Sequence, residues 1–234
     1  MDFFTQFDGN LLIGIQHALN ADWLTPIMKL ITMFGEDGIF WIAVCLVLIL
    51  FRRTRRLGVI CALSLLCTFI ACNLCLKPLI DRVRPWITFQ LVNPMLPPPG
   101  DASFPSGHSA NSMGPAWAMF ITTMPVKTAE GRSYDEVRCL GWKGEGVSPR
   151  TMHKFGIAAV VLAVLIGISR LYLGMHYPSD VVCGLLIGMI VATAVYRIIL
   201  RIEDSHGMMD TWLPGKKRKK SEKDHRKQMG RAAR

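Results

Sequence analysis

Residues 57–76 have the sequence LGVICALSLLCTFIACNLCL, twenty residues without a charged side chain. A helix needs about twenty predominantly apolar residues to cross the hydrocarbon core of a bilayer. Four arginines precede this stretch within residues 52–56, where they would lie at the membrane surface. The stretch therefore predicts a membrane-spanning helix in an integral membrane protein.

Other apolar stretches predict further spans, so we expect an all-α helical bundle with about five transmembrane helices. The stretch 109–126 is the least apolar, with Asn111, Ser112 and Pro115, and we expect the other helices to surround it. The Glu36-Asp37 pair precedes the first span and suits a helix N-terminus. The predicted spans are residues 38–51, 57–76, 109–126, 155–170 and 179–200.

The N-terminal residues predict a different arrangement. Residues 9–35 are amphipathic and are interrupted by Asn20, Asp22 and Pro26. Two short helices at the membrane interface fit this pattern better than a sixth span. We therefore expect an interfacial segment (1–35), a transmembrane domain (36–201) and a basic, disordered tail (202–234).

The 234 residues are 51% hydrophobic and carry a net charge of +10, a combination that argues against a cytosolic enzyme. Eight of these net charges belong to residues 216–234, which hold almost nothing apolar to bury. A nucleic-acid or nuclear-targeting role is the alternative, but we expect a solvated tail near anionic lipid headgroups. No nucleic-acid partner is expected, and the sequence leaves the oligomeric state open.

Lysine and arginine are distributed unevenly between the two predicted faces. The loops 52–56 and 127–154 and the chain from Arg197 onward hold twenty-two of the twenty-seven, and the other side holds five. Cytoplasmic loops are enriched in these residues. We therefore expect a cytoplasmic C-terminus, and a multi-pass protein of the plasma (inner) membrane.

Three polar segments fall on the predicted outer face, and we expect them to form an anion site. They are Lys77–Pro85, Pro105–His108 and Ser169–Asp180. Together they bring three cations and two histidines toward one another. In the second segment, Gly107 permits close backbone approach, and the N–H groups of a starting helix can cradle a phosphate beside the Ser106 hydroxyl.

The third segment predicts a helix that begins at Pro178. Asp180 is then the third helical residue, and its carboxylate can reach back toward His176. A bond to one ring nitrogen would leave the other free to attack.

Each residue also has a structural alternative. Lys77 and Arg84 could be anchors at the membrane surface, His108 a polar cap, and Asp180 an ordinary acid of a first helical turn. Asp81 and Arg82 are expected to be surface or locally paired residues.

Taken together, the segments read KxxxxxxRP, PSGH and SRxxxxxHxxxD, and this order closely resembles the type 2 phosphatidic-acid phosphatase superfamily of membrane lipid phosphatases. The resemblance implies that His176 is the nucleophile, that Asp180 orients it, and that His108 is the general acid and base. It also implies that the phosphate oxygens are held by residues that donate hydrogen bonds: Lys77, Arg84, Ser106, Gly107 and Arg170. We expect neither a metal nor another cofactor.

The resemblance further implies a lipid phosphate substrate and a phosphohistidine intermediate at the extracytoplasmic face. Undecaprenyl diphosphate, a lipid of cell-wall synthesis, is the leading substrate. Phosphatidylglycerophosphate and phosphatidic acid are alternatives, as are lipid phosphotransfer and a non-catalytic lipid transporter or scaffold.

Overall fold

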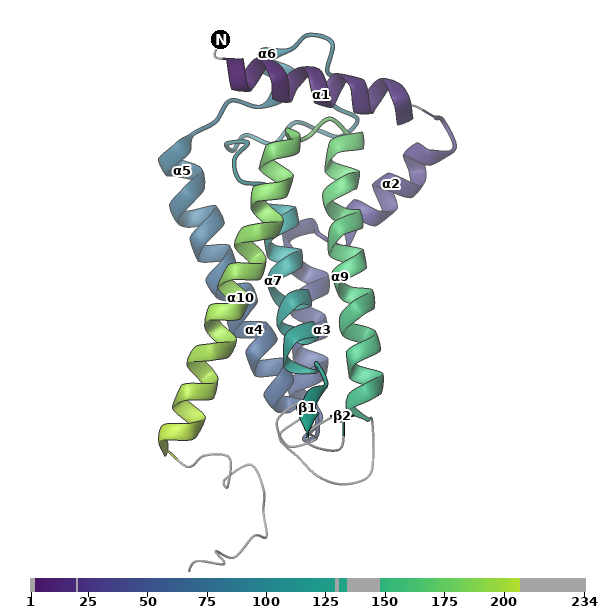
Figure 1. The fold of residues 1–234 in the computed structure, drawn as a ribbon. Helices are drawn as coiled ribbons and strands as arrows, with labels where there is room; N and C mark the ends of the chain where they lie inside the picture. Colours follow the sequence, from purple (N-terminus) through teal and green to yellow (C-terminus); the bar gives the residue numbers. More distant parts are fainter. Residues whose placement is uncertain (1–2, 20, 129–130, 134–147, 207–234) are drawn as a thin grey trace, which may run out of the picture.

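The computed structural model is an α-helical bundle (Figure 1), and it describes residues 3–19, 21–128, 131–133 and 148–206. The basic tail beyond residue 206 and most of the loop 127–153 therefore lie outside the described residues. The all-α prediction is confirmed, apart from a short hairpin of β1 (Val126–Thr128) and β2 (Gly131–Ser133).

Within the described residues, four segments are long and apolar enough to cross a membrane: Leu24–Leu50, Arg55–Thr88, Pro149–Tyr172 and Pro178–Glu203. The first joins α2 (Leu24–Met33) to α3 (Ile39–Leu50), with the short turn η1 (Glu36–Gly38) between them. The second contains α4 (Arg55–Phe69), the π-helical turn η2 (Ile70–Leu76), α5 (Lys77–Ile80) and α6 (Pro85–Thr88). The others are α9 (Pro149–Tyr172) and most of α10 (Pro178–His206).

The remaining predicted span, residues 109–126, corresponds to α7 (Gly107–Thr122), which is not among these four segments. It has sixteen residues, and most of them are buried between α4, α9 and α10. Glycines allow α10 to approach closely, because a Cβ at Gly184 would lie 2.7 Å from the Ser106 carbonyl oxygen. Since its neighbours shield it, α7 tolerates the polar residues that a lipid-facing helix would exclude.

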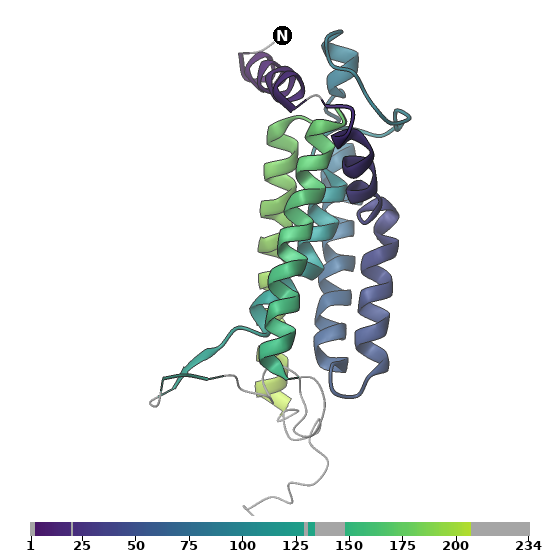
Figure 2. The ribbon, with the colours of Figure 1, turned by 90° about the vertical axis from the view of Figure 1, so that its right-hand side faces the viewer.

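The N-terminal region contains α1 (Phe3–Leu19) and α2, and α2 belongs to the apolar segment Leu24–Leu50, so the interfacial position expected for residues 1–35 stays a prediction. Helix α1 ends at Leu19 and α2 begins at Leu24, so Asp22 lies between the two helices, whereas Pro26 lies in the first turn of α2, where proline is tolerated. Figures 1 and 2 show that α1 lies across one end of the bundle, opposite to the end that carries the hairpin.

Candidate active site

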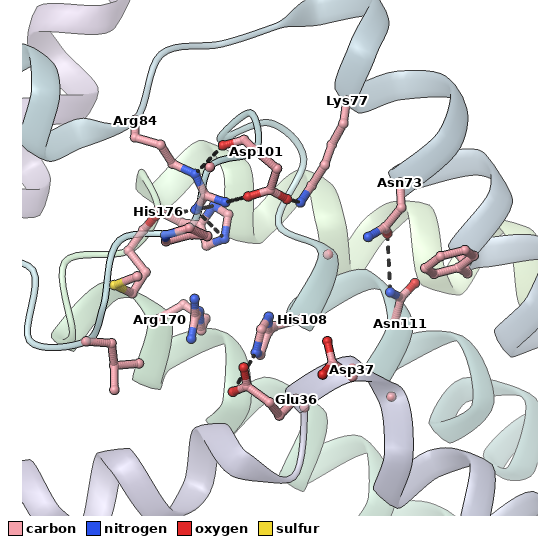
Figure 3. Close-up of a pocket in the computed structure, with 18 of the residues that line it drawn as sticks. Glu36, Asp37, Asn73, Lys77, Arg84, Asp101, His108, Asn111, Arg170 and His176 are labelled. Carbon is pink, nitrogen blue, oxygen red and sulfur yellow. Dashed lines mark hydrogen bonds and ion pairs between the residues drawn. The ribbon is translucent and has the colours of Figure 1, made fainter.

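A cavity of about 630 Å³ opens at the end of the bundle beneath α1 (Figure 3). Its wall is built by η1, the junction of η2 and α5, the loop before α7, the start of α7, and the loop between α9 and α10. Ten of its polar residues are labelled in the figure: Glu36, Asp37, Asn73, Lys77, Arg84, Asp101, His108, Asn111, Arg170 and His176.

Three cations line this cavity, as the sequence predicts. Lys77 begins α5, Arg84 precedes α6, and Arg170 lies in the last turn of α9. All three are buried, although like charges repel and buried charge is costly without a partner. Such a cluster is stabilised by an anion between its members.

In the structure, part of that negative charge comes from Asp101. Its carboxylate accepts from both Lys77 and Arg84, and its backbone oxygen accepts from Arg84 Nε at 3.0 Å. Partial burial opposes ionisation, but the two cations outweigh it and hold the Asp101 pKa below its usual range. No sequence motif includes Asp101, so its position beside the cations was not predicted.

Arg170 is less completely paired. Its Nη1 donates to Thr32 Oγ1 at 3.0 Å, while its buried Nε has no hydrogen-bond partner among the described residues. A buried donor without a partner is uncommon and needs an explanation. A phosphate oxygen in the cavity would provide that partner.

His176 lies in the loop between α9 and α10, and its side chain is next to that of Arg84. Its Nε2 is 3.1 Å from Arg84 Nη1, and its Nδ1 is 3.6 Å from Asp180 Oδ2. Burial is the main reason that the His176 pKa falls to about 4; Asp180 opposes this effect and Arg84 adds to it. The ring is therefore neutral near pH 7, as a nucleophile must be.

Asp180 lies behind His176, outside the cavity wall. The helix α10 begins at Pro178, as predicted, and Asp180 Oδ2 accepts from the backbone N–H of Tyr177 at 3.0 Å. Ser103 Oγ donates to the same carboxylate at 2.5 Å. These bonds fix a carboxylate that is fully buried.

The expectation that Arg82 is a surface or locally paired residue was wrong. Its Nη1 donates to Asp180 at 2.6 Å and its Nη2 donates to Asp8 at 2.8 Å, so it joins α1 to α10. Its side chain is only 15% exposed. Sequence spacing gave no signal for these contacts, because the partners lie 98 and 74 residues away.

The start of α7 contributes Gly107 and His108 to the cavity, whereas Ser106, which precedes the helix, does not line it. Ser106 caps α7: its hydroxyl oxygen accepts from the Ser109 N–H at 3.4 Å and from the Ser109 hydroxyl at 2.9 Å. Its backbone N–H donates to the Asp180 carbonyl oxygen at 3.0 Å, which ties this helix start to α10. The predicted phosphate contact of the Ser106 hydroxyl therefore stays a prediction.

His108 faces the cavity wall that η1 forms. Its Nε2 lies 3.6 Å from Glu36 Oε2. Burial, followed by Arg170 and His176, lowers the His108 pKa to about 2, so the ring is neutral near pH 7. Glu36 and Asp37 were interpreted as N-terminal acids of a helix, but both line the cavity.

A family model of the PAP2 superfamily matches residues 53–204, more than half of the chain. The chain belongs to the PAP2 superfamily. The match contains the three segments that the sequence analysis singled out, and it leaves α1, α2, η1 and α3 outside.

Several relatives carry phosphatase names. The chain is 29% identical to undecaprenyl-diphosphatase of Sulfolobus acidocaldarius over 168 residues, which cover 70% of this chain and 66% of that protein. It is 30% identical to phosphatidylglycerophosphatase B of Bacillus subtilis, with 77% of this chain and 70% of that protein covered. Lipid A 4'-phosphatase of Bacteroides thetaiotaomicron is also 30% identical, with 66% and 60% covered. The chain thus spans about two thirds of the length of these relatives.

The fold matches the crystal structure of a transmembrane PAP2 type phosphatidylglycerolphosphate phosphatase from Bacillus subtilis. The TM-score is 0.65 at 25% identity, and the match covers 86% of this chain and 89% of that chain. This PAP2 chain is therefore a multi-pass membrane lipid phosphatase, which belongs to the phosphoric ester hydrolases.

Proposed function

We propose that this PAP2 protein hydrolyses a lipid phosphate or diphosphate through a phosphohistidine at His176. The observation that carries the proposal is the setting of that ring: His176 is neutral, it lies 3.1 Å from Arg84, and the buried Asp180 lies behind it. A neutral imidazole beside fixed cations is suited to attack a phosphorus atom whose oxygens those cations hold.

In the first step, His176 Nε2 forms a bond to phosphorus and the bond from phosphorus to the leaving oxygen breaks. His108 gives a proton to that oxygen, while Asp180 stabilises the positive charge that develops on His176. In the second step, His108 takes a proton from water, whose oxygen bonds to phosphorus as the P–N bond breaks. Lys77, Arg84 and Arg170 hold the nonbridging oxygens, with the Gly107 N–H as a further donor.

Substrate binding must rearrange the side chains that line the cavity. Asp101 occupies Lys77 and Arg84, and Arg84 also contacts the attacking nitrogen of His176. A phosphate dianion carries more charge than the Asp101 carboxylate and would take over these donors. His176 Nε2 would then be free to approach phosphorus.

Undecaprenyl diphosphate is our leading substrate, and phosphatidylglycerophosphate and phosphatidic acid are the alternatives. The undecaprenyl-diphosphatase relative supports the first, and the phosphatidylglycerophosphatase relative supports the second. The cavity lies at the end of the bundle opposite to the arginine-rich loop 52–56, which favours an extracytoplasmic site by the positive-inside rule. We place the protein in the plasma (inner) membrane on that basis.

The test is phosphate release by the purified protein from each of the three lipids, in EDTA, alongside His176→Ala. We expect release in EDTA and loss of about a thousandfold or more in the variant. Acid-labile, base-stable phosphate on the wild-type chain would identify the phosphohistidine. Undiminished release by His176→Ala would overturn the mechanism, and loss in EDTA with recovery in magnesium would overturn metal independence.

A further inference from the structure

The break between α2 and α3 places two acids on the wall that faces the cationic group (Figure 3). Asp37 and Gly38 have positive φ angles of 47° and 69°, so the turn η1 interrupts the helical path. Glu36 and Asp37 consequently line the cavity, and Figure 3 shows Glu36 beside His108. This turn lies outside the residues that the PAP2 family model matches.

The turn holds one edge of the His108 ring. Nε2 of that ring is buried and has no hydrogen-bond partner among the described residues, and Glu36 Oε2 lies 3.6 Å away. Gly35 packs on the same edge, because a Cβ there would lie 2.9 Å from His108 Cδ2. The other ring nitrogen is turned toward the side where Lys77 and Asp101 lie (Figure 3).

The proposed mechanism requires a proton that the surroundings of His108 oppose. Burial and then Arg170, His176, Lys77 and Arg84 lower the His108 pKa to about 2. Among the described residues, Glu36 is the acid within ion-pair distance of the ring. A carboxylate there favours the imidazolium, and a bound phosphate dianion would add to this effect by neutralising the cations.

We propose that Glu36 is a positioning residue for His108: its carboxylate accepts a hydrogen bond from the Nε2–H group and holds the ring with Nδ1 facing the leaving oxygen. This inference rests on the proposed function. It gives each histidine its own carboxylate, Asp180 for His176 and Glu36 for His108. The second pairing arises from the N-terminal helices.

The role predicts a dependence on the leaving group. An alkoxide leaving from phosphatidic acid is strongly basic and needs its proton in the transition state, whereas p-nitrophenolate is stable without one. Weakening the general acid should therefore slow phosphatidic acid hydrolysis far more than p-nitrophenyl phosphate hydrolysis.

The experiment compares Glu36→Gln, Glu36→Asp and Asp37→Asn in the full-length protein in detergent. For Glu36→Gln, we expect kcat on phosphatidic acid to fall roughly 10- to 100-fold and kcat on p-nitrophenyl phosphate to fall less than about threefold. KM should change little for either substrate, and Glu36→Asp should recover part of kcat. Thermal melting of each variant checks that it is folded.

Asp37→Asn is the matched control, because it neutralises the neighbouring acid on the same wall. Among the described residues, no ion pair joins Asp37 to His108. We expect this variant to affect both substrates alike. In a His108→Ala background, Glu36→Gln should cause no further loss.

Three results would overturn the role of Glu36 while leaving the proposed function intact: equal losses on both substrates, a loss confined to KM, or a further loss in the His108→Ala background. Failure of the proposed function would be distinct. In that case the wild-type protein would release no phosphate from undecaprenyl diphosphate, phosphatidylglycerophosphate or phosphatidic acid, or His176→Ala would retain the wild-type rate.

Discussion

Arg56 and Arg170 are buried at opposite ends of the bundle, and their side chains have different hydrogen-bond partners. At one end, Arg56 on α4 donates to Glu203 on α10 through Nε at 2.7 Å and Nη2 at 2.6 Å, and both side chains are 3% exposed. At the other end, Arg170 donates to Thr32, and its buried Nε has no partner among the described residues.

This difference separates a structural charge from a binding charge. The Arg56–Glu203 pair has the forked geometry in which both charges are satisfied, and it joins two helices. Arg170 bears the cost of burial, and no carboxylate forms an ion pair with it in the described part of the chain. We infer that the first pair stabilises the fold, whereas the second position supports the binding of an anion that enters from outside.

The largest expected effect is on stability, at the paired end. Glu203→Gln leaves Arg56 buried without its counter-charge, so the free energy of unfolding should fall by about 3–5 kcal/mol. Activity per folded molecule should remain. Chemical unfolding and phosphate release at low temperature measure the two quantities.

The control for that variant is the double replacement Arg56→Met and Glu203→Met. Removing both charges with apolar side chains of similar size is often close to neutral. A double variant as unstable as Glu203→Gln would show that the lost contacts, and not an uncompensated charge, cause the effect.

The opposite pattern is expected at Arg170. Arg170→Gln should lower kcat/KM by about 100- to 1000-fold, the usual cost of losing one transition-state donor. The free energy of unfolding should stay the same or rise, because an incompletely paired charge is removed. Steady-state kinetics and chemical unfolding test this prediction. A loss of stability as large as that of Glu203→Gln would show that Arg170 stabilises the fold as the Arg56–Glu203 pair does.

A third prediction concerns His176, which is buried at the site end. Burial lowers its pKa to about 4, whereas an unfolded histidine titrates near 6.5. The stability linked to this neutral ring is present above pH 6.5 and is lost as the pH falls toward 4, because the unfolded chain binds the proton first. This contribution is on the order of 2–3 kcal/mol.

His176→Asn removes the titrating group and keeps a side chain of similar polarity. Between pH 6.5 and pH 4, its free energy of unfolding should therefore decline less steeply than that of the wild type. Thermal or chemical unfolding in detergent at several pH values gives both curves. Parallel curves would mean that His176 does not contribute to acid sensitivity.

The smallest expected effect is at Asp101, whose carboxylate is 48% exposed. Asp101→Asn should strengthen competitive inhibition by inorganic phosphate by up to about fivefold, since partly exposed ion pairs contribute about 1 kcal/mol or less. Asp81→Asn, at an exposed acid four residues after Lys77, is the control. Weaker inhibition would show that Asp101 positions Lys77 and Arg84 for phosphate and does not compete with it.

Hydropathy and helix-start signals predicted much of the fold. The uncharged stretch 57–76 lies within the apolar segment Arg55–Thr88, and Pro178 begins α10. These features depend on residues close together in the sequence. The boundaries of α7 were less well predicted, because its length and polarity reflect the helices around it.

The candidate site was predicted in part. The spacing of the three motifs identified Lys77, Arg84, Gly107, His108, Arg170 and His176, and the structure places all of them around one cavity. It did not identify Asp101, Glu36 or Arg82. Each of these makes its contacts across a long sequence separation, so no local pattern marks it.

The sequence alone determined that this is a membrane protein with its polar motifs at helix ends, because apolar length and residue spacing are local properties. Only the tertiary structure decided which buried charges are paired. Arg56 pairs with Glu203 across the bundle, and Asp101 binds Lys77 and Arg84. Within the part of the chain that the structure describes, Arg170 Nε has no hydrogen-bond partner. Electrostatic stabilisation depends on distance in space, and the packing of distant helices and loops sets that distance.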